Sequence, residues 1–227
     1  MKDKLNLIYK KLLEEYGFQG WWPLLSLHKN GINPTKTGSM NGYHPKDYSF
    51  PRNKNEQFEI IIGTVLTQNT SWTSVEKSLF NLKKLNSISP EKILKISLDE
   101  FKNAIKPSGY YNQKAERLKL LAKWFIDREE IPTRDELLKL KGVGPETADS
   151  ILLYAYKIPS FVIDTYTKRT LIKLKLIDET FSYNEIKKFF EDNLELDFKI
   201  FQEFHALLVE HAKRLKSGEK DFLLIFK

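Results

Sequence analysis

Apolar side chains along this 227-residue chain recur at the spacing of an α-helix, and this periodicity limits the fold more than any other feature. One stripe holds apolar residues at i, i+3, i+4, i+7 and i+8, namely Phe58, Ile61, Ile62, Val65 and Leu66. The pattern recurs over 118–125 and 148–155. No convincing series of alternating apolar and polar residues competes with it. The sequence therefore predicts a nearly all-α fold of about ten helices, if each averages roughly a dozen residues.

Helix start signals agree with these stripes. Ser89 stands before Pro90, which suits the first position of a helix. Ser97 and Thr133 are each followed three residues later by a glutamate, which is the arrangement of a capping box. A last long helix is expected over 196–216.

Residues 26–55 break the helical pattern. Glycines and prolines fall among polar residues there, and no periodicity survives. At about 30 residues the stretch exceeds ordinary loop lengths, which leaves two interpretations, a functional flap or a disordered insertion.

Composition excludes several chemistries and favours one kind of partner. Because the chain has no cysteine, a disulfide framework, a thiolate zinc site, a cysteine-ligated iron–sulfur cluster and a cysteine nucleophile are all ruled out. The net charge of +7 suits a polyanion, and the 13% of aromatic residues suits base stacking, although core packing accounts for most rings. We find no targeting segment and no apolar run of about 18 residues, so a cytoplasmic, nucleoid-associated protein without membrane contact is expected.

The most informative segment is 138–148, with the sequence LKLKGVGPETA. A helix is expected to end near Lys139, a tight turn to follow at Gly142–Gly144 with Val143 anchored in the core, and a new helix to start at Pro145. The first backbone N–H groups of such a helix are unpaired and lie at the positive end of its dipole. This helix–hairpin–helix would bind a phosphate without reading base sequence.

A single carboxylate stands twenty residues after Gly144. The apolar run 161–163 delivers Asp164 to the expected start of another helix. Taken alone, Asp164 is more simply interpreted as a helix N-cap, for which aspartate is a preferred residue.

Residues 140–148 followed by Asp164 resemble the helix-hairpin-helix and Gly/Pro…Asp signature of the endonuclease III superfamily of DNA glycosylases. The resemblance covers residues 17–23 and 56–216. Three local motifs are similar to the 3-methyladenine DNA glycosylases that lack an iron–sulfur cluster: Trp21-Trp22-Pro23, the turn 66–70 and the segment 107–115.

The resemblance implies two helical subdomains flanking a cleft. Residues 56–157 would form a six-helix subdomain with the hairpin. Residues 1–55 and 158–227 would join in the second subdomain, with the long loop at 26–55. A damaged nucleotide would be pushed out of double-stranded DNA into the cleft. A monomer is expected, because reading one damaged base needs no two-fold symmetry.

The same resemblance suggests roles for individual residues. Asp164 matches the catalytic aspartate, which stabilises positive charge on the deoxyribose as the glycosidic bond breaks. Gln68 matches the residue that fills the gap left in the base stack, or else it is an ordinary polar turn residue. The main-chain carbonyls of Leu138, Leu140 and Val143 match positions that hold a Na⁺ or K⁺ ion. No other cofactor is expected.

One departure from the family pattern concerns the reaction class. Bifunctional members carry a lysine two residues after the second hairpin glycine, where it attacks the sugar, whereas this sequence has Glu146. A monofunctional glycosylase is therefore predicted. Lys141 stands where many relatives have proline and is expected to meet a phosphate, with a displaced lyase lysine as the alternative. The residues expected at the DNA are Gln68, Lys141, Gly142, Val143, Gly144, Glu146 and Thr147.

Substrate choice would come from the base pocket. Trp21, Trp22 and Pro23 match a stacking wall and Trp72 matches an aromatic position opposite it, with core packing as the alternative for each tryptophan. Two flat rings would sandwich a base, and a cationic alkylated purine would gain from their π faces. Lys213 matches a lysine at the pocket rim, or is a solvated surface lysine.

The sequence thus favours a monofunctional DNA glycosylase for alkylated purines, chiefly 3-methyladenine, in base excision repair. One alternative is a uracil or oxidised-purine glycosylase of the same fold. Another is a non-catalytic module that binds DNA structure through the hairpin alone. His205 and His211 do not share a helix face, so no metal pair is expected, and each is interpreted as a packed or surface histidine.

Overall fold

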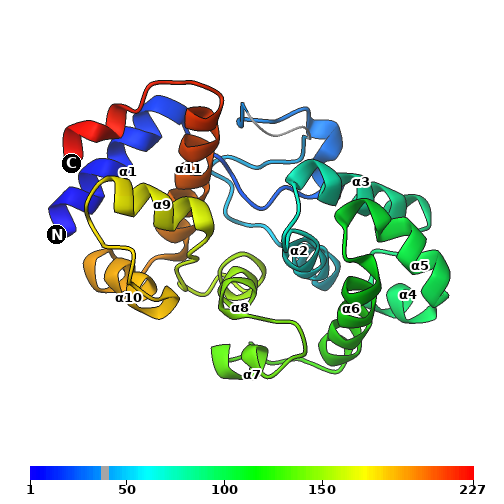
Figure 1. The fold of residues 1–227 in the computed structure, drawn as a ribbon. Coiled ribbons are helices and arrows are strands. Elements are labelled where there is room, and N and C mark those ends of the chain that lie inside the picture. Colours follow the sequence, from blue (N-terminus) through cyan, green and yellow to red (C-terminus); the bar gives the residue numbers. More distant parts are fainter. Residues whose placement is uncertain (37–40) are drawn as a thin grey trace.

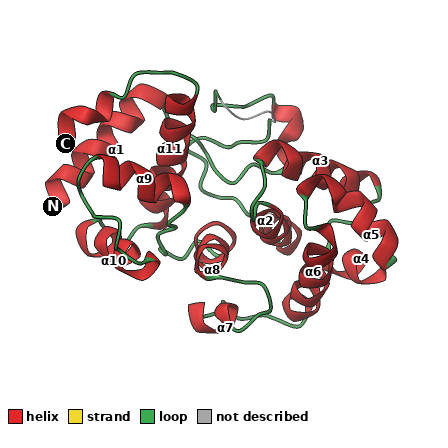
Figure 2. Cartoon of the chain, in the orientation of Figure 1, coloured by secondary structure: helices red, strands yellow, loops and turns green. Residues whose placement is uncertain are grey.

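The computed structural model describes residues 1–36 and 41–227, and every regular element in these ranges is a helix (Figures 1 and 2). The all-α prediction is therefore confirmed for the described residues. The α-helices are α1 (Lys2–Tyr16), α2 (Lys54–Leu66), α3 (Trp72–Lys84), α4 (Pro90–Lys95), α5 (Leu98–Ile105), α6 (Tyr111–Ile126), α7 (Arg134–Leu138), α8 (Pro145–Ser150), α9 (Thr165–Lys173), α10 (Tyr183–Asn193) and α11 (Phe198–Lys216). Shorter elements are three 3₁₀ helices, η1 (Leu25–Asn30), η2 (Lys106–Ser108) and η4 (Phe222–Phe226), and the π-helix η3 (Ile151–Ala155).

The helices form two groups, with α8 between them (Figure 1). α1 packs against α11 and η4, and α9 packs against α11, so the two ends of the chain lie side by side. α2 packs against α6, α8 and η3, while α3 and α6 pack against α5 and η2, and α4 packs against α6. The subdomain boundaries at 55/56 and 157/158 stay a prediction. No helix in the described part of the chain is long and apolar enough to cross a membrane.

Helix starts follow the predicted cap residues. Ser89 caps α4 with Pro90 directly after it, and Thr133 forms a complete capping box at α7. Ser97 caps α5 by accepting a hydrogen bond from the Glu100 N–H at 3.2 Å. These side chains satisfy N–H groups that a helix leaves unpaired at its first turn, which is why the chain changes direction at these residues.

The described part of the segment 26–55 places several of its side chains in the protein interior. Tyr43, His44 and Phe50 are buried within it, and η1 forms its first turn. Two main-chain carbonyls face the His44 ring: that of Trp22 lies 3.0 Å from Nε2 and that of Asp47 lies 2.8 Å from Nδ1. Disorder is therefore the wrong interpretation for the described residues of this segment. Residues 37–40 lie outside them, and a role as a flap stays a prediction.

Candidate active site and DNA-binding hairpin

The predicted hairpin joins α7 to α8. Gly142 has φ +85°, and a Cβ there would lie 2.3 Å from Arg117 Cδ, so only glycine fits. Gly144 has an extended φ of −94° and nothing within 4 Å of the position a Cβ would take. The Gly144 backbone is therefore open to close approach by a ligand. Val143 is buried, as predicted, and its N–H donates to the Leu140 carbonyl at 3.1 Å.

Gln68 lies against this hairpin. Its Nε2 donates to the Gly142 carbonyl at 3.0 Å and to Thr147 Oγ1 at 2.9 Å, while Arg117 Nη1 donates to its Oε1 at 2.9 Å. To enter a base stack, the Gln68 side chain would have to break these three hydrogen bonds. Arg117 was not predicted as a site residue, although it holds Gln68 by a hydrogen bond and covers Gly142.

Asp164 occupies the N-cap of α9, and its side chain is 15% exposed. Oδ1 accepts the Thr167 N–H at 2.7 Å, and Oδ2 lies 3.7 Å from Nε2 of His205. Burial alone would raise the pKa of Asp164, but His205 and the Thr167 hydrogen bonds outweigh it and hold this pKa below its usual range. Asp164 is therefore a cap and also an ionised carboxylate beside a histidine.

Sequence reasoning missed His205 as a neighbour of this carboxylate. His205 is packed, as interpreted, and its Nδ1 lies 2.7 Å from the hydroxyl of Tyr154. A signal was present, because His205, Val209 and Lys213 recur every four residues on α11 and so share a face. His211 lies on another face of α11, where it bonds the Tyr16 hydroxyl and Asp221.

Two further charged groups lie within electrostatic range of Asp164. Glu146 is exposed at the first turn of α8, and its pKa is raised by desolvation and by the charge of Asp164, against the opposing effect of His205. Lys213 is half-buried, and burial lowers its pKa. The negative charges of Glu210, Asp164 and Glu76 raise this pKa but do not outweigh burial. The structure thus brings these two predicted residues to Asp164.

The predicted pocket aromatics form one cluster. Trp22 meets Trp72 nearly perpendicularly at a centroid distance of 5.3 Å, and Trp21 meets His205 in the same way at 5.7 Å. Trp22 and Pro23 are buried, whereas Trp21 and Trp72 are half-buried. A base could enter between Trp22 and Trp72 only if these rings separated. The three indole N–H groups are buried without a hydrogen-bond partner among the described residues.

Two buried carboxyl groups hold the segment that carries the paired tryptophans. Glu203 of α11 accepts the Gln19 N–H at 2.5 Å, and Glu59 of α2 accepts the Leu25 N–H at 2.6 Å. The segment is thus fixed at both ends, once from each group of helices. Sequence reasoning missed both glutamates, because the position of a glutamate on a helix does not indicate which distant N–H group its carboxylate will bind.

Lys141 projects from the hairpin with its side chain 72% exposed, 3.9 Å from a carboxylate oxygen of Glu116. Its exposure leaves the ammonium accessible, and contact of Lys141 with DNA stays a prediction. Among the described residues, no group of three or more His, Asp or Glu side chains could hold a metal ion.

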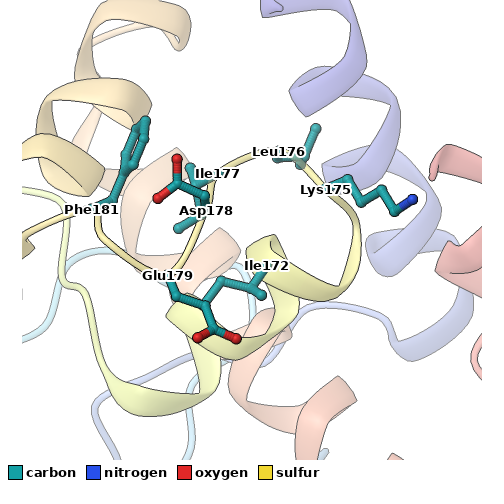
Figure 3. Close-up of a pocket in the computed structure, with 7 residues that line it drawn as sticks. All are labelled: Ile172, Lys175, Leu176, Ile177, Asp178, Glu179 and Phe181. Atoms are coloured by element: carbon teal, nitrogen blue, oxygen red, sulfur yellow. The ribbon is translucent and has the colours of Figure 1, made fainter.

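One hollow lies apart from the predicted residues. Its volume is about 550 Å³, and it lies between the end of α9 and the start of α10 (Figure 3). Asp178 beside it accepts hydrogen bonds from Thr180 of its own turn, and none of the predicted site residues lines the hollow. Its lining residues are Ile172, Lys175, Leu176, Ile177, Asp178, Glu179 and Phe181.

Residues 62–196 match the family described as HhH-GPD superfamily base excision DNA repair protein. The chain belongs to this superfamily. This HhH-GPD protein is a DNA glycosylase of base excision repair, and the resemblance to the endonuclease III superfamily is confirmed. The match takes in the hairpin and Asp164.

Individual relatives agree with this assignment. A Methanocaldococcus jannaschii protein, whose name assigns it to the DNA repair glycosylases, is 40% identical over 224 residues, 93% of this chain and 88% of the relative. Endonuclease III of Thermotoga maritima is 36% identical over 127 residues, 53% of this chain and 58% of the relative.

Solved structures give the same fold. The H. pylori 3-methyladenine DNA glycosylase bound to 1,N6-ethenoadenine has a TM-score of 0.64 at 33% identity, over 72% of this chain and 90% of that one. A non-covalent endonuclease III–DNA complex has a TM-score of 0.72 at 21% identity, over 100% of this chain and 94% of that one, and shows the fold alone. As a member of a base excision DNA repair family, this HhH-GPD glycosylase acts on DNA.

Proposed function

We propose that this HhH-GPD glycosylase is monofunctional and excises alkylated purines, with 3-methyladenine as the favoured base. One observation carries the proposal: an ionised carboxylate, Asp164, caps α9 within electrostatic range of Glu146, which stands where a lyase would need a nucleophilic amine. A carboxylate can stabilise positive charge on a sugar, but Glu146 cannot form a Schiff base.

The reaction proposed for Asp164 is hydrolysis of the N-glycosidic bond. The damaged nucleotide leaves the stack, and its sugar comes to the Asp164 carboxylate. As the bond to the base lengthens, negative charge on Asp164 offsets positive charge on the deoxyribose, and water then adds to the sugar carbon. An alkylated purine carries positive charge and departs readily, so no strong acid is needed to protonate it.

The half-buried ring of Trp21 supports the choice of base. The ring packs against His205, which faces Asp164, and we propose that a flipped base would come to rest beside it. A cationic base gains from contact with an indole face. Buried polar groups normally have partners, so the unpartnered indole N–H groups are consistent with a ligand that brings acceptor atoms.

The hairpin is proposed to bind the DNA backbone. Open space at Gly144 and the exposed ammonium of Lys141 supply a phosphate with backbone and side-chain donors. The carbonyls of Leu138, Leu140 and Val143 would hold a Na⁺ or K⁺ ion, which would add positive charge toward the phosphate. The Leu140 carbonyl accepts the Val143 N–H and keeps a second lone pair for such an ion.

Release of free base tests this function. The protein is incubated with methylated duplex DNA, released bases are separated by chromatography, and strand cleavage and borohydride trapping are scored in parallel. We expect 3-methyladenine without strand cleavage and without a trapped adduct. A trapped adduct would contradict the monofunctional assignment.

The Asp164→Asn variant separates an enzyme from a non-catalytic DNA-binding module. We expect base release to fall by at least about 100-fold, because an amide cannot offset the positive charge, while duplex affinity stays unchanged. Unchanged excision by this variant would remove Asp164 from the reaction.

Lys213 favours a second candidate substrate class. If its ammonium is charged it repels a cationic base and instead suits a neutral base with carbonyl oxygens, as in uracil or an oxidised purine. Duplexes with uracil or 8-oxoguanine, assayed beside methylated DNA, distinguish the two classes. Release of one of these bases, with none from methylated DNA, would favour the second.

A further inference from the structure

The proposed reaction uses Asp164 but leaves a buried histidine beside it without a role. We propose that His205 is the positioning residue for Asp164, the middle member of a Tyr154–His205–Asp164 chain that keeps the carboxylate ionised and fixes its orientation. The catalytic consequence of this inference rests on the proposed function of Asp164. The Tyr154–His205–Asp164 arrangement itself does not.

The two ring nitrogens of His205 have different surroundings. Nδ1 lies 2.7 Å from the Tyr154 hydroxyl, whereas Nε2 is buried and has no hydrogen-bond partner among the described residues. Facing Nε2 is Oδ2 of Asp164, at 3.7 Å. A lone pair on Nε2 would point at a carboxylate, which is unfavourable, whereas a proton there would be attracted. The surroundings therefore favour the tautomer with the proton on Nε2.

Tyr154 completes this assignment. With the proton of neutral His205 on Nε2, Nδ1 becomes an acceptor and the Tyr154 hydroxyl donates to it. The alternative acceptor for Tyr154 is the Gln202 carbonyl, at the longer distance of 3.3 Å. Because Tyr154 is buried in the π-helix, its hydroxyl holds the imidazole from the side opposite Asp164.

The contacts of Asp164 leave its carboxylate little freedom to rotate. Thr167 N–H fixes Oδ1 at 2.7 Å, and the imidazole faces Oδ2. The distance of 3.7 Å exceeds a hydrogen bond, but catalytic hydrogen bonds often tighten only when substrate is bound. Trp21 packs edge-on against the same imidazole at 5.7 Å, so the chain also connects the carboxylate to the pocket wall.

Charged groups from several elements surround this chain. Glu146 on α8, Lys213 on α11 and Tyr154 on the π-helix lie within electrostatic range of Asp164. Burial and the negative charge of Glu146 both favour a protonated Asp164, whereas His205 is the main group that opposes them. Loss of His205 would therefore move Asp164 toward its protonated form at a given pH.

Nitrogen NMR of the histidines tests the chain without any assay of activity. The protein contains four histidines, so selective ¹⁵N labelling gives a resolved spectrum. We expect His205 to carry its proton on Nε2, Asp164→Asn to shift the Nε2 resonance, and Tyr154→Phe to shift the Nδ1 resonance. His28, which packs edge-on against Phe80, should not respond to either variant. A proton on Nδ1, or no response to Asp164→Asn, would overturn the proposal even in a fully active enzyme.

The pH profile of single-turnover base release tests the catalytic consequence. In His205→Phe, which keeps an aromatic ring but loses both nitrogens, the acid limb should move to higher pH, with a loss of about tenfold at pH 6 and less at pH 8. His205→Gln should restore part of the rate, because its amide can donate to Asp164. His28→Gln is the matched control and should follow the parent profile. An equal loss at every pH would show a purely structural role and overturn the proposal.

Discussion

At the scale of single residues, one glycine decides where Trp22 lies. The indole packs flat on α2 at Gly63, where a Cβ would lie 2.8 Å from Nε1 and 3.2 Å from two ring carbons. The ring is buried against Trp72 and Tyr154 and has little room to retreat. Gly63→Ala should therefore cost about 1–3 kcal/mol of stability and move the pocket wall.

Urea unfolding and near-ultraviolet circular dichroism measure the Gly63→Ala effect. Gly144→Ala is the matched control, because its Cβ would meet nothing within 4 Å and its φ is ordinary. We expect that control to keep parent stability and parent tryptophan signals. Equal behaviour of the two variants would mean that Gly63 does not position Trp22.

Residues whose role is local could be predicted from the sequence, whereas residues that act across the fold could not. Gly142, Val143 and the Asp164 cap depend on neighbours in the chain, and the structure shows each of them as expected. His205 meets Asp164 only because α11 packs on α9, a contact that no local pattern encodes. The catalytic role of Asp164 stays a prediction.

At the scale of elements, the segment 19–25 depends on two buried carboxyl groups whose protonation changes near neutral pH. Burial is the main cause that raises the pKa of Glu59 and of Glu203 to about 7, against the N–H groups that each carboxyl accepts. An unfolded glutamate has a pKa of about 4.3, so the folded state binds more protons between these values. Stability should therefore fall as pH rises from about 4.3 to 7, by at most about 4 kcal/mol for each group.

The double variant Glu59→Gln, Glu203→Gln tests this pH dependence. An amide oxygen can still accept the Gln19 and Leu25 N–H groups but cannot ionise, so the variant should lose less stability than the parent between pH 5 and pH 8. Urea unfolding at both pH values gives the comparison, with exposed Glu14→Gln as the control. Parallel losses in parent and double variant would contradict the assignment.

Helices were predictable as elements because their apolar stripes and caps lie within each helix. The segment 26–55 was not, because its order comes from distant partners. His44 reaches the Trp22 carbonyl, and the Lys157 ammonium donates to the Ser49 carbonyl at 2.6 Å. A polar segment rich in glycine and proline gives no sign of such contacts, so the sequence could only show that it was irregular.

At the scale of the whole molecule, Asp149 connects the hairpin to the helices around the chain ends. It is fully buried on α8 and accepts two hydrogen bonds from Arg134 of α7, at 2.8 and 3.0 Å. It also accepts the Ser160 hydroxyl at 2.6 Å, and Lys187 of α10 lies 3.5 Å away. One carboxylate thus neutralises two cations from elements on either side of α8.

Asp149→Ala should destabilise the whole protein. It leaves Arg134 partly buried without its counter-ion, whereas Lys187 keeps its ion pair with Glu191, and loss of one partner of a buried pair costs about 3–5 kcal/mol. The matched control is Asp192→Ala, because Asp192 pairs with Lys188 at 2.9 Å on the surface of α10, where such a pair is worth about 0–1 kcal/mol. Urea unfolding should separate the two variants by at least about 2 kcal/mol. If the two variants lost similar amounts of stability, the Asp149 cluster would not be what joins the two groups of helices. The apolar contacts between the helices would then hold the hairpin in place.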